Sequence, residues 1–257
     1  MEVSHMPASE SNALHAIIDS LRPLGDVAIS EARVGAYWLA VVSRRCGLAA
    51  MPHVGHATPA PALDPAAATD LIGRQALSVA AWALSDDAGR AAAGMAAINS
   101  LIEPDLARCR EMNARDVLLE RAPGHFVAMV GHFPFTDELR AAAGRLAVLE
   151  LHPRPGDLPA EQAAAILPAA DVVGITAITL ANHTFDALVR LCRPDAFVVM
   201  LGGTTPLSPV LFDFGVDVIA GTIVTDPARL MEGISRGATF RQLEGKRPVL
   251  MFRDQPA

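Results

Sequence analysis

The segment Phe126-Val-Ala-Met-Val130 decides the fold class of this chain of 257 residues. Every residue in it is apolar, so it predicts a strand buried on both faces, as the strands of parallel sheets are. Glycine and polar residues follow at once, in Gly131-His-Phe-Pro-Phe135. Similar short apolar runs recur further along the chain, at residues 146–151, 171–176, 196–201 and 216–220.

Helical stretches separate these apolar runs. We expect helices near residues 137–143, 160–167, 184–191 and 226–234. Strands that alternate with single helices predict a parallel sheet with helices on both faces, because each crossover must return over one face of the sheet. The second half of the chain is therefore predicted to be a Rossmann-like, doubly wound α/β domain.

The first half has a different rhythm. Partly alternating runs at residues 26–33, 36–42 and 47–51 predict a small antiparallel meander. We expect helices at 12–22, near 69–77 and at 87–101, and a loop in the proline-rich segment 53–65. The predicted division is an α+β domain over residues 1–112 and the α/β domain over 113–257, which opens with a helix at 113–120.

Composition excludes several classes of protein. The net charge is −7, and no long run of Lys or Arg predicts contact with nucleic acid. No apolar run approaches the length of a membrane span, and the polar N-terminus does not resemble a signal peptide. The cysteines Cys46, Cys109 and Cys192 lack CxxC spacing, which favours reduced thiols and a cytoplasmic location. The oligomeric state stays open, a homo-oligomer included.

Small or polar residues follow every predicted strand of the second half. They are Gly131 and the residues after it, Glu150, and the segments 176–184, 202–206 and 221–222. Ligands of doubly wound sheets bind beyond the carboxyl ends of the strands, where the strand order reverses. Glycines allow a ligand to approach the backbone, and hydroxyl and amide groups donate hydrogen bonds. The sequence therefore predicts a small-ligand site at this edge.

His132 and Glu150 are the candidate catalytic residues. An imidazole and a carboxylate can act as acid and base or bind a divalent metal. Glu150 follows Gly131 by 19 residues, near the spacing of a ribose-binding carboxylate, but the missing GxGxxG motif disfavours NAD. His132 has the alternative role of packing within its loop.

The candidate ligand-binding residues lie mainly in two loops. Asn182 or Thr184 could instead cap the following helix, and Gly202-Gly203 could form a tight turn. Asn99, an unfavourable residue in an alanine-rich helix, is expected to face the cleft between the domains. The full set is Asn99, Gly131, Thr176, Thr179, Asn182, His183, Thr184, Gly202, Gly203, Thr204, Thr205 and Pro206.

Metal ligation is an open alternative. The cofactor is not determined by the sequence, and a divalent transition metal is the candidate. His53-Val-Gly-His56 has HxxH form, but without a neighbouring cysteine or carboxylate a solvated loop is favoured.

Five segments of the sequence can be considered together. They are Gly94-Met-Ala-Ala-Ile-Asn-Ser100, Gly131-His-Phe-Pro-Phe135, residues 176–184, residues 202–209 and Phe212-Asp-Phe-Gly-Val-Asp-Val-Ile-Ala-Gly-Thr222. In combination they resemble the heavy-metal chelation family, long known as a domain of unknown function. The resemblance extends from about residue 15 to 245. It implies an N-terminal domain similar to that of enolase, a Rossmann-like C-terminal domain, and a site in the cleft between them.

The chain departs from the pattern of that family at several positions. Ala177, Ile178 and His183 replace glycine, threonine and glycine, and Gly203 replaces a proline after glycine. The family residues Asn182, Thr184, Thr205 and Pro206 are retained.

Three functions follow as hypotheses. The first is a binding protein or enzyme for a small molecule or metal ligand, acting in heavy-metal chelation or metal-cofactor metabolism, with its site in the interdomain cleft. The second is an enzyme that binds a nucleotide or S-adenosylmethionine, and the third is a non-catalytic carrier. The expected partner is a small-molecule or metal ligand, and neither nucleic acid nor a membrane.

Overall fold

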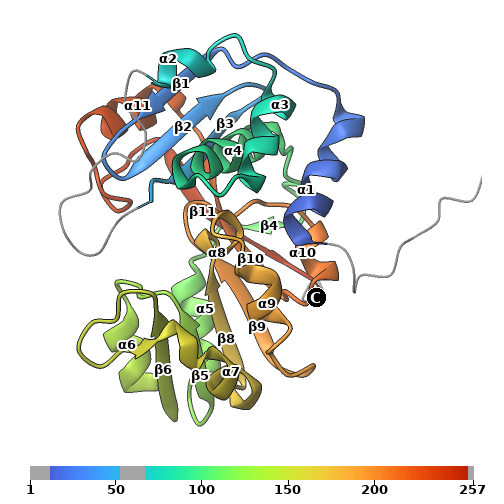
Figure 1. Ribbon diagram of the computed structural model, residues 1–257. Helices are drawn as coiled ribbons and strands as arrows, with labels where there is room; N and C mark the ends of the chain where they lie inside the picture. The colour runs from blue at the N-terminus through green and yellow to red at the C-terminus, as the bar shows by residue number, and fades with distance from the viewer. Residues whose placement is uncertain (1–11, 53–66, 254–257) are drawn as a thin grey trace, which may run out of the picture.

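The computed structural model describes residues 12–52 and 67–253 (Figure 1). A three-stranded antiparallel sheet lies near the start of the chain, in the order β1-β2-β3. Its strands are β1 (Glu31–Val34), β2 (Trp38–Val42) and β3 (Cys46–Ala50). This is the predicted meander, although the first strand begins several residues later than the sequence indicates. The predicted loop at 53–65 lies outside the described residues.

Helices from both ends of the chain cover this small sheet. Leu39 and Val41 of β2 face the core shared with α4, whereas Ala40 faces α11 and contacts the cluster of Leu230 and Ile234. Figure 1 shows α11, coloured red, beside the blue strands β1 and β2. The helices around the sheet are α1 (Ala13–Leu21), η1 (Arg22–Leu24), α2 (Ala67–Leu71), α3 (Ala76–Ala80), η2 (Ala81–Leu84), α4 (Ala88–Leu101) and α11 (Pro227–Ser235).

The second sheet has eight strands, in the order β4-β11-β10-β9-β8-β5-β6-β7. From β5 the chain passes outward to β6 and then returns to β8 on the opposite side of β5, so the strand order reverses between β5 and β8. The strands are β4 (Cys109–Arg110), β5 (Phe126–Val130), β6 (Arg145–Glu150), β7 (Leu158–Pro159), β8 (Val172–Thr176), β9 (Phe197–Leu201), β10 (Val218–Val224) and β11 (Lys246–Phe252).

Helices cover both faces of this sheet. Val127 and Met129 of β5 pack toward α5 and α6, whereas Ala128 and Val130 pack toward the opposite face. All the pairs from β6 through β5, β8 and β9 to β10 are parallel, which confirms the predicted doubly wound α/β class. The helices are α5 (Ala114–Arg121), α6 (Thr136–Ala142), η3 (Ala160–Gln162), α7 (Ala163–Ile166), η4 (Leu167–Ala169), α8 (Ile178–Ala181), α9 (Phe185–Val189) and α10 (Val210–Asp213).

The antiparallel strands β4 and β11 were not predicted. Pro248 obscures β11 in the sequence, because proline cannot donate a ladder hydrogen bond and is confined to edges. β4 pairs only with Leu250 and Met251, so the flank of β11 opposite β10 is open at Pro248. Two local predictions were also wrong: residues 69–77 are split into α2 and α3 around Gly73, and the segment 176–184 contains the short helix α8. None of the helices within 12–52 and 67–253 is long and apolar enough to cross a membrane.

Two glycines bring α4 into close contact with its neighbours. A Cβ atom on Gly47 of β3 would lie 2.1 Å from the carbonyl oxygen of Ala96, and one on Gly94 would lie 2.0 Å from the backbone nitrogen of Ala83. Backbone atoms cannot move aside as flexible side chains can. The glycines therefore set the distance of α4 from β3 and from η2.

We expect Gly94→Ala to lower the free energy of unfolding by about 1–3 kcal/mol, because the new methyl group overpacks a backbone contact. Alanine alone would favour the helix by about 1 kcal/mol over glycine. Gly233→Ala in α11 is the matched control, because the nearest atom to its Cβ would be the end of the Leu243 side chain, at 3.0 Å, with no backbone atom closer than 4.0 Å. Urea unfolding of both variants checks this, and equal changes in stability would contradict it.

Candidate functional site

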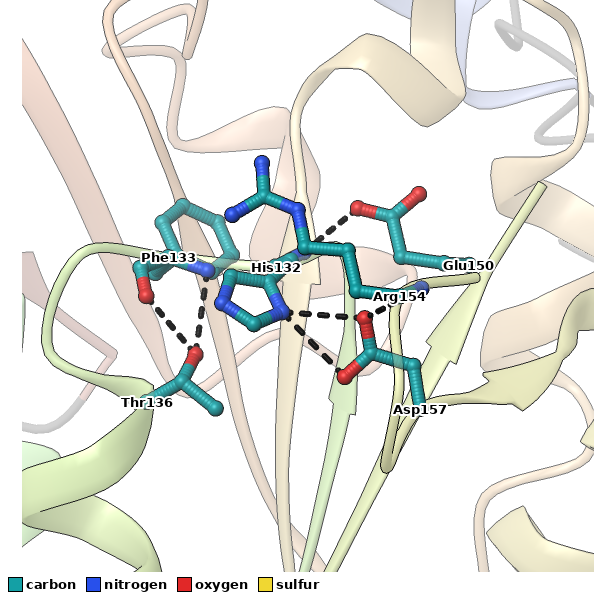
Figure 2. A network of polar contacts seen from close by, with 6 residues as sticks. All are labelled: His132, Phe133, Thr136, Glu150, Arg154 and Asp157. Carbon is teal, nitrogen blue, oxygen red and sulfur yellow. Dashed lines mark hydrogen bonds and ion pairs between the residues drawn. The ribbon is translucent and has the colours of Figure 1, made fainter. Parts of the chain in front are cut away.

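An open hollow lies at the carboxyl ends of β5 and β6, next to the reversal of strand order. The loop after β5 and the start of α6 form one side of it, and the loop after β6 forms the other (Figure 2). This is the edge at which doubly wound sheets bind ligands. Its lining residues are His132, Phe133, Pro134, Thr136, Asp137 and Arg154.

A buried carboxylate orients the imidazole of His132. Nδ1 of His132 lies 3.0 Å and 3.2 Å from the two carboxylate oxygens of Asp157. The Asp157 side chain is 1% exposed, whereas that of His132 is 20% exposed. A buried carboxylate requires hydrogen-bond donors, and here the His132 ring and the backbone N–H of Arg154, at 3.1 Å, supply them. The carboxylate therefore fixes the orientation of the ring.

This arrangement leaves Nε2 of His132 available. When the ring is neutral and Nδ1–H donates to Asp157, the lone pair resides on Nε2. Within the described residues, Nε2 has no hydrogen-bond partner. The ring can therefore accept a proton or donate to a metal at Nε2, and in its charged form it can donate a hydrogen bond to an anion.

Hydrogen bonds between side chains and the backbone fix the loop after β5. Oε1 of Glu150 accepts from the backbone N–H of His132 at 2.6 Å, which joins the end of β6 to the loop after β5. Oγ1 of Thr136 donates to the carbonyl of Phe133 at 2.7 Å and accepts from its N–H at 3.1 Å. The predicted candidates His132 and Glu150 thus lie together, and Glu150 holds the loop that carries His132.

Arg154 brings a positive charge to the hollow. Within residues 12–52 and 67–253 its guanidinium forms no ion pair. Figure 2 shows the side chain directed toward His132 and Phe133. An unpaired guanidinium beside an imidazole suits a carboxylate or phosphate group.

The ends of β5, β8 and β9 meet closely at the reversal of strand order. Gly131 has φ 105°, and a Cβ there would lie 3.2 Å from the side chain of Thr176. Gly202 has φ 123°, and its Cβ would lie 3.9 Å from Oγ1 of Thr176. Both glycines have a positive φ, a backbone conformation that favours glycine. The predicted ligand-binding residues Gly131, Thr176 and Gly202 are therefore neighbours.

Asn99, Gly203 and Thr205 meet elsewhere, around a cavity of about 30 Å³ between the two sheets. Nδ2 of Asn99 donates to the carbonyls of Leu48 and Thr204, at 2.9 Å and 3.0 Å, and so connects β3 to the loop after β9. A cavity of this volume has room for a water molecule but not for an organic ligand. It shares no lining residue with the hollow at His132.

The loop after β9 is held firmly against the small sheet. Oγ1 of Thr204 accepts from the backbone N–H of Ala50 at 2.8 Å. Thr205 and Pro206 are buried, and Oγ1 of Thr205 has no hydrogen-bond partner in the described residues. The residues of this loop therefore join the two sheets. They were predicted to bind the ligand, but they lie apart from the open hollow.

Local hydrogen bonds occupy the residues after β8. Oδ1 of Asn182 accepts from the backbone N–H and the hydroxyl of Thr184, at 3.3 Å and 2.7 Å, and the Thr179 hydroxyl donates to the carbonyl of Thr176 at 2.6 Å. Nε2 of His183 bonds the carbonyl of Ala83 at 2.8 Å. These contacts form a turn that joins α8 to η2.

Sequence reasoning missed Asp157 and Arg154. They belong to the segment Pro153-Arg-Pro-Gly-Asp157, directly after the second strand of the α/β half. Two charged residues around a Pro-Gly turn at a strand end are the signal that could have indicated them. The pairing of Asp157 with His132, 25 positions away, requires the tertiary structure.

The described residues do not fit a resident metal ion. No group of three or more His, Cys, Asp or Glu side chains within 12–52 and 67–253 could hold one. The three cysteines are free and separate, and burial raises the pKa of Cys46 to about 12 and that of Cys192 to about 11, which disfavours the thiolate that a metal needs. His53 and His56 lie outside the described residues.

His183 has a left-handed backbone conformation, with φ 61°. It stands where the sequence pattern of the family that this chain resembles has glycine. We expect both His183→Ala and His183→Gly to lose the bond to Ala83, but only alanine keeps the backbone strain. The alanine variant should be less stable than the glycine variant by about 0.5–1 kcal/mol, allowing for the greater chain entropy of unfolded glycine. Thermal or urea unfolding measures the difference, and the reverse order would refute this account.

Two solved structures of similar fold align with nearly the whole chain. One is a protein of unknown function from Desulfitobacterium hafniense, with 26% sequence identity and a TM-score of 0.81, covering 93% of this chain and 97% of that chain. Another is a protein of unknown function from Pyrococcus horikoshii, with 19% identity and a TM-score of 0.75, covering 93% and 99%. Both belong to the DUF364 family. No curated protein matches this chain.

Two families, both described as "Putative heavy-metal chelation", match the sequence. DUF4213 matches residues 16–102, and DUF364 matches residues 113–250, which is more than half of the chain. The resemblance seen in the sequence motifs is thereby confirmed. With its α/β fold and the match over residues 113–250, this chain belongs to the DUF364 family.

Proposed function

We propose that this chain binds a small anionic molecule in the hollow at His132. The observation that carries the proposal is the joint placement of His132 and Arg154, one oriented by a buried carboxylate and the other without an ion-pair partner in the described residues. The guanidinium of Arg154 donates hydrogen bonds to carboxylate or phosphate, and the His132 ring donates one from Nε2–H in its charged form. The ligand class is therefore a small organic acid or a phosphorylated compound.

The position of the hollow supports this function as well. It lies at the carboxyl ends of β5 and β6, next to the reversal of strand order between β5 and β8. The sequence predicted the ligand site between the two domains. The cavity between the two sheets has a volume of only about 30 Å³, and Asn99, which lines it, donates hydrogen bonds to β3 and to the loop after β9. We therefore place the ligand at the strand ends of β5 and β6, and we assign a joining role to the residues around Asn99.

Proton transfer is the chemistry available in this hollow. Nε2 of His132 can take a proton from a bound ligand, and Asp157 would stabilise the imidazolium that forms, because its carboxylate is buried beside Nδ1. In this proposal His132 is the acid–base residue, Asp157 positions it, and Arg154 binds the anion. The same geometry serves a non-catalytic carrier, which would use His132 and Arg154 for binding alone.

A nucleotide or S-adenosylmethionine ligand has less support. Glu150 ends the second strand of the α/β half, where such folds place a ribose-binding carboxylate. Its Oε1, however, already accepts the backbone N–H of His132, and the sequence lacks the glycine-rich phosphate loop.

The family description supports a ligand that contains a metal. The free cysteines agree with the reducing cytoplasm that we expect.

We expect Arg154→Gln to weaken binding of citrate or inorganic phosphate by about 1.4 kcal/mol, or tenfold in Kd, because a charged hydrogen bond is lost. His132→Ala should weaken it in the same direction. Isothermal titration calorimetry measures both. Arg33→Gln and His15→Ala alter exposed residues of β1 and α1 and serve as controls. Equal affinity in all four variants, or no binding of either anion by the unaltered protein, would contradict the proposal.

A further inference from the structure

The hollow at His132 offers few donor atoms for a metal ion. Oε1 of Glu150 accepts the backbone N–H of His132, and both carboxylate oxygens of Asp157 face Nδ1. Among its lining residues this leaves Nε2 of His132 and the exposed carboxylate of Asp137. Zinc sites in proteins use three or four protein ligands. A free divalent ion would therefore keep most of its water and bind weakly.

The charges in this hollow are mixed. Arg154 has no acidic partner within the described residues, whereas Asp137 contributes an exposed carboxylate. The guanidinium repels a bare cation and attracts a carboxylate of a ligand. A metal that arrives with carboxylate ligands can therefore bind Arg154 through them.

The His132–Asp157 pair nevertheless has the form of a metal-binding histidine. Metal-ligating imidazoles commonly donate the other ring N–H to a carboxylate, which fixes the ring and raises the basicity of the donor nitrogen. Here the buried Asp157 accepts from Nδ1, and His132, whose Nε2 has no hydrogen-bond partner in the described residues, lines the hollow. One well-oriented nitrogen suits a metal that still has an open coordination position.

We propose that the ligand of this hollow is an anionic chelate, in which an organic polycarboxylate holds a divalent transition metal. Nε2 of His132 displaces one water from the metal, and Arg154 binds a carboxylate of the chelator. The metal is thus cargo that arrives with its ligand, and the protein has no resident metal at this site. This inference rests on the proposed anion site and adds the metal to it.

Four probes separate the contributions to binding. Nickel citrate is anionic and retains water on the metal, nickel–EDTA is anionic with every coordination position filled, citrate lacks the metal, and nickel chloride supplies the free ion. We expect the affinity for nickel citrate to exceed that for each other probe by about tenfold, because it alone can engage both Nε2 and the guanidinium. Calorimetry and equilibrium dialysis with elemental analysis measure affinity and stoichiometry.

Variants then assign the metal contact. His132→Ala should lower the affinity for nickel citrate by about tenfold more than it lowers the affinity for nickel–EDTA, which has no open position for Nε2. Asp157→Asn, a change in a positioning residue, should lower the nickel citrate affinity by about tenfold or more. Binding of nickel citrate should also shift the visible absorption of nickel, because a nitrogen replaces an oxygen donor, and His132→Ala should abolish that shift. His15→Ala is the matched control.

The outcomes distinguish this inference from the proposed function. If citrate binds as tightly as nickel citrate and His132→Ala weakens the binding of both by the same factor, the anion site stands and the chelate is refuted. If nickel chloride binds as tightly as nickel citrate, the protein binds a free ion, and loss of that binding in a His53→Ala, His56→Ala double variant would place the ion at the HxxH motif. If none of the probes binds, both the anion site and the chelate are wrong.

Discussion

Burial of β5 on both faces is the constraint on which the rest of the structure depends. Val127 and Met129 are covered by α5 and α6, and Ala128 lies against the opposite core. A strand with two apolar faces needs helices on both, and helical crossovers make its neighbours parallel. All the carboxyl ends then lie at one edge. Because β6 and β8 flank β5 on opposite sides, the strand order reverses between β5 and β8, and the hollow at His132 lies next to that point, at the ends of β5 and β6.

The two sheets are held together by segments that cross between them. α11, from the C-terminal half, covers one face of the small sheet, and β4, which precedes the predicted boundary at residue 112, pairs in the large one. Single hydrogen bonds add to this: Asn99 reaches Thr204, and the side chain of Asp186 accepts the N–H of Ala13 at the start of α1. This interlocking leaves little space between the sheets, which is why we propose a ligand site at the strand ends instead.

Hydrogen bonds within the protein organise the hollow at His132. Asp157 is buried and receives donors from the imidazole and from the Arg154 backbone, so its desolvation is offset by hydrogen bonds. The same turn carries the Arg154 side chain into the hollow. Because these hydrogen bonds fix the ring and the loop, the binding of a ligand would cost the ring and the loop little conformational entropy. The groups available to a ligand in this hollow are Nε2 of His132 and the guanidinium of Arg154.

The sequence by itself determined the α/β class and the parallel strands, and it predicted the edge at which a ligand should bind, because apolar runs, helical periodicity and glycines at strand ends are local signals. It indicated His132 and Glu150, which lie at two of those ends. It could not place Asp157 beside His132, nor show that Asn99 and Thr204 join the sheets, since these contacts connect residues distant in the chain. The strand β11 was hidden for a related reason. Proline is unfavourable in a strand unless one flank is open, and only the tertiary structure decides which flank is open.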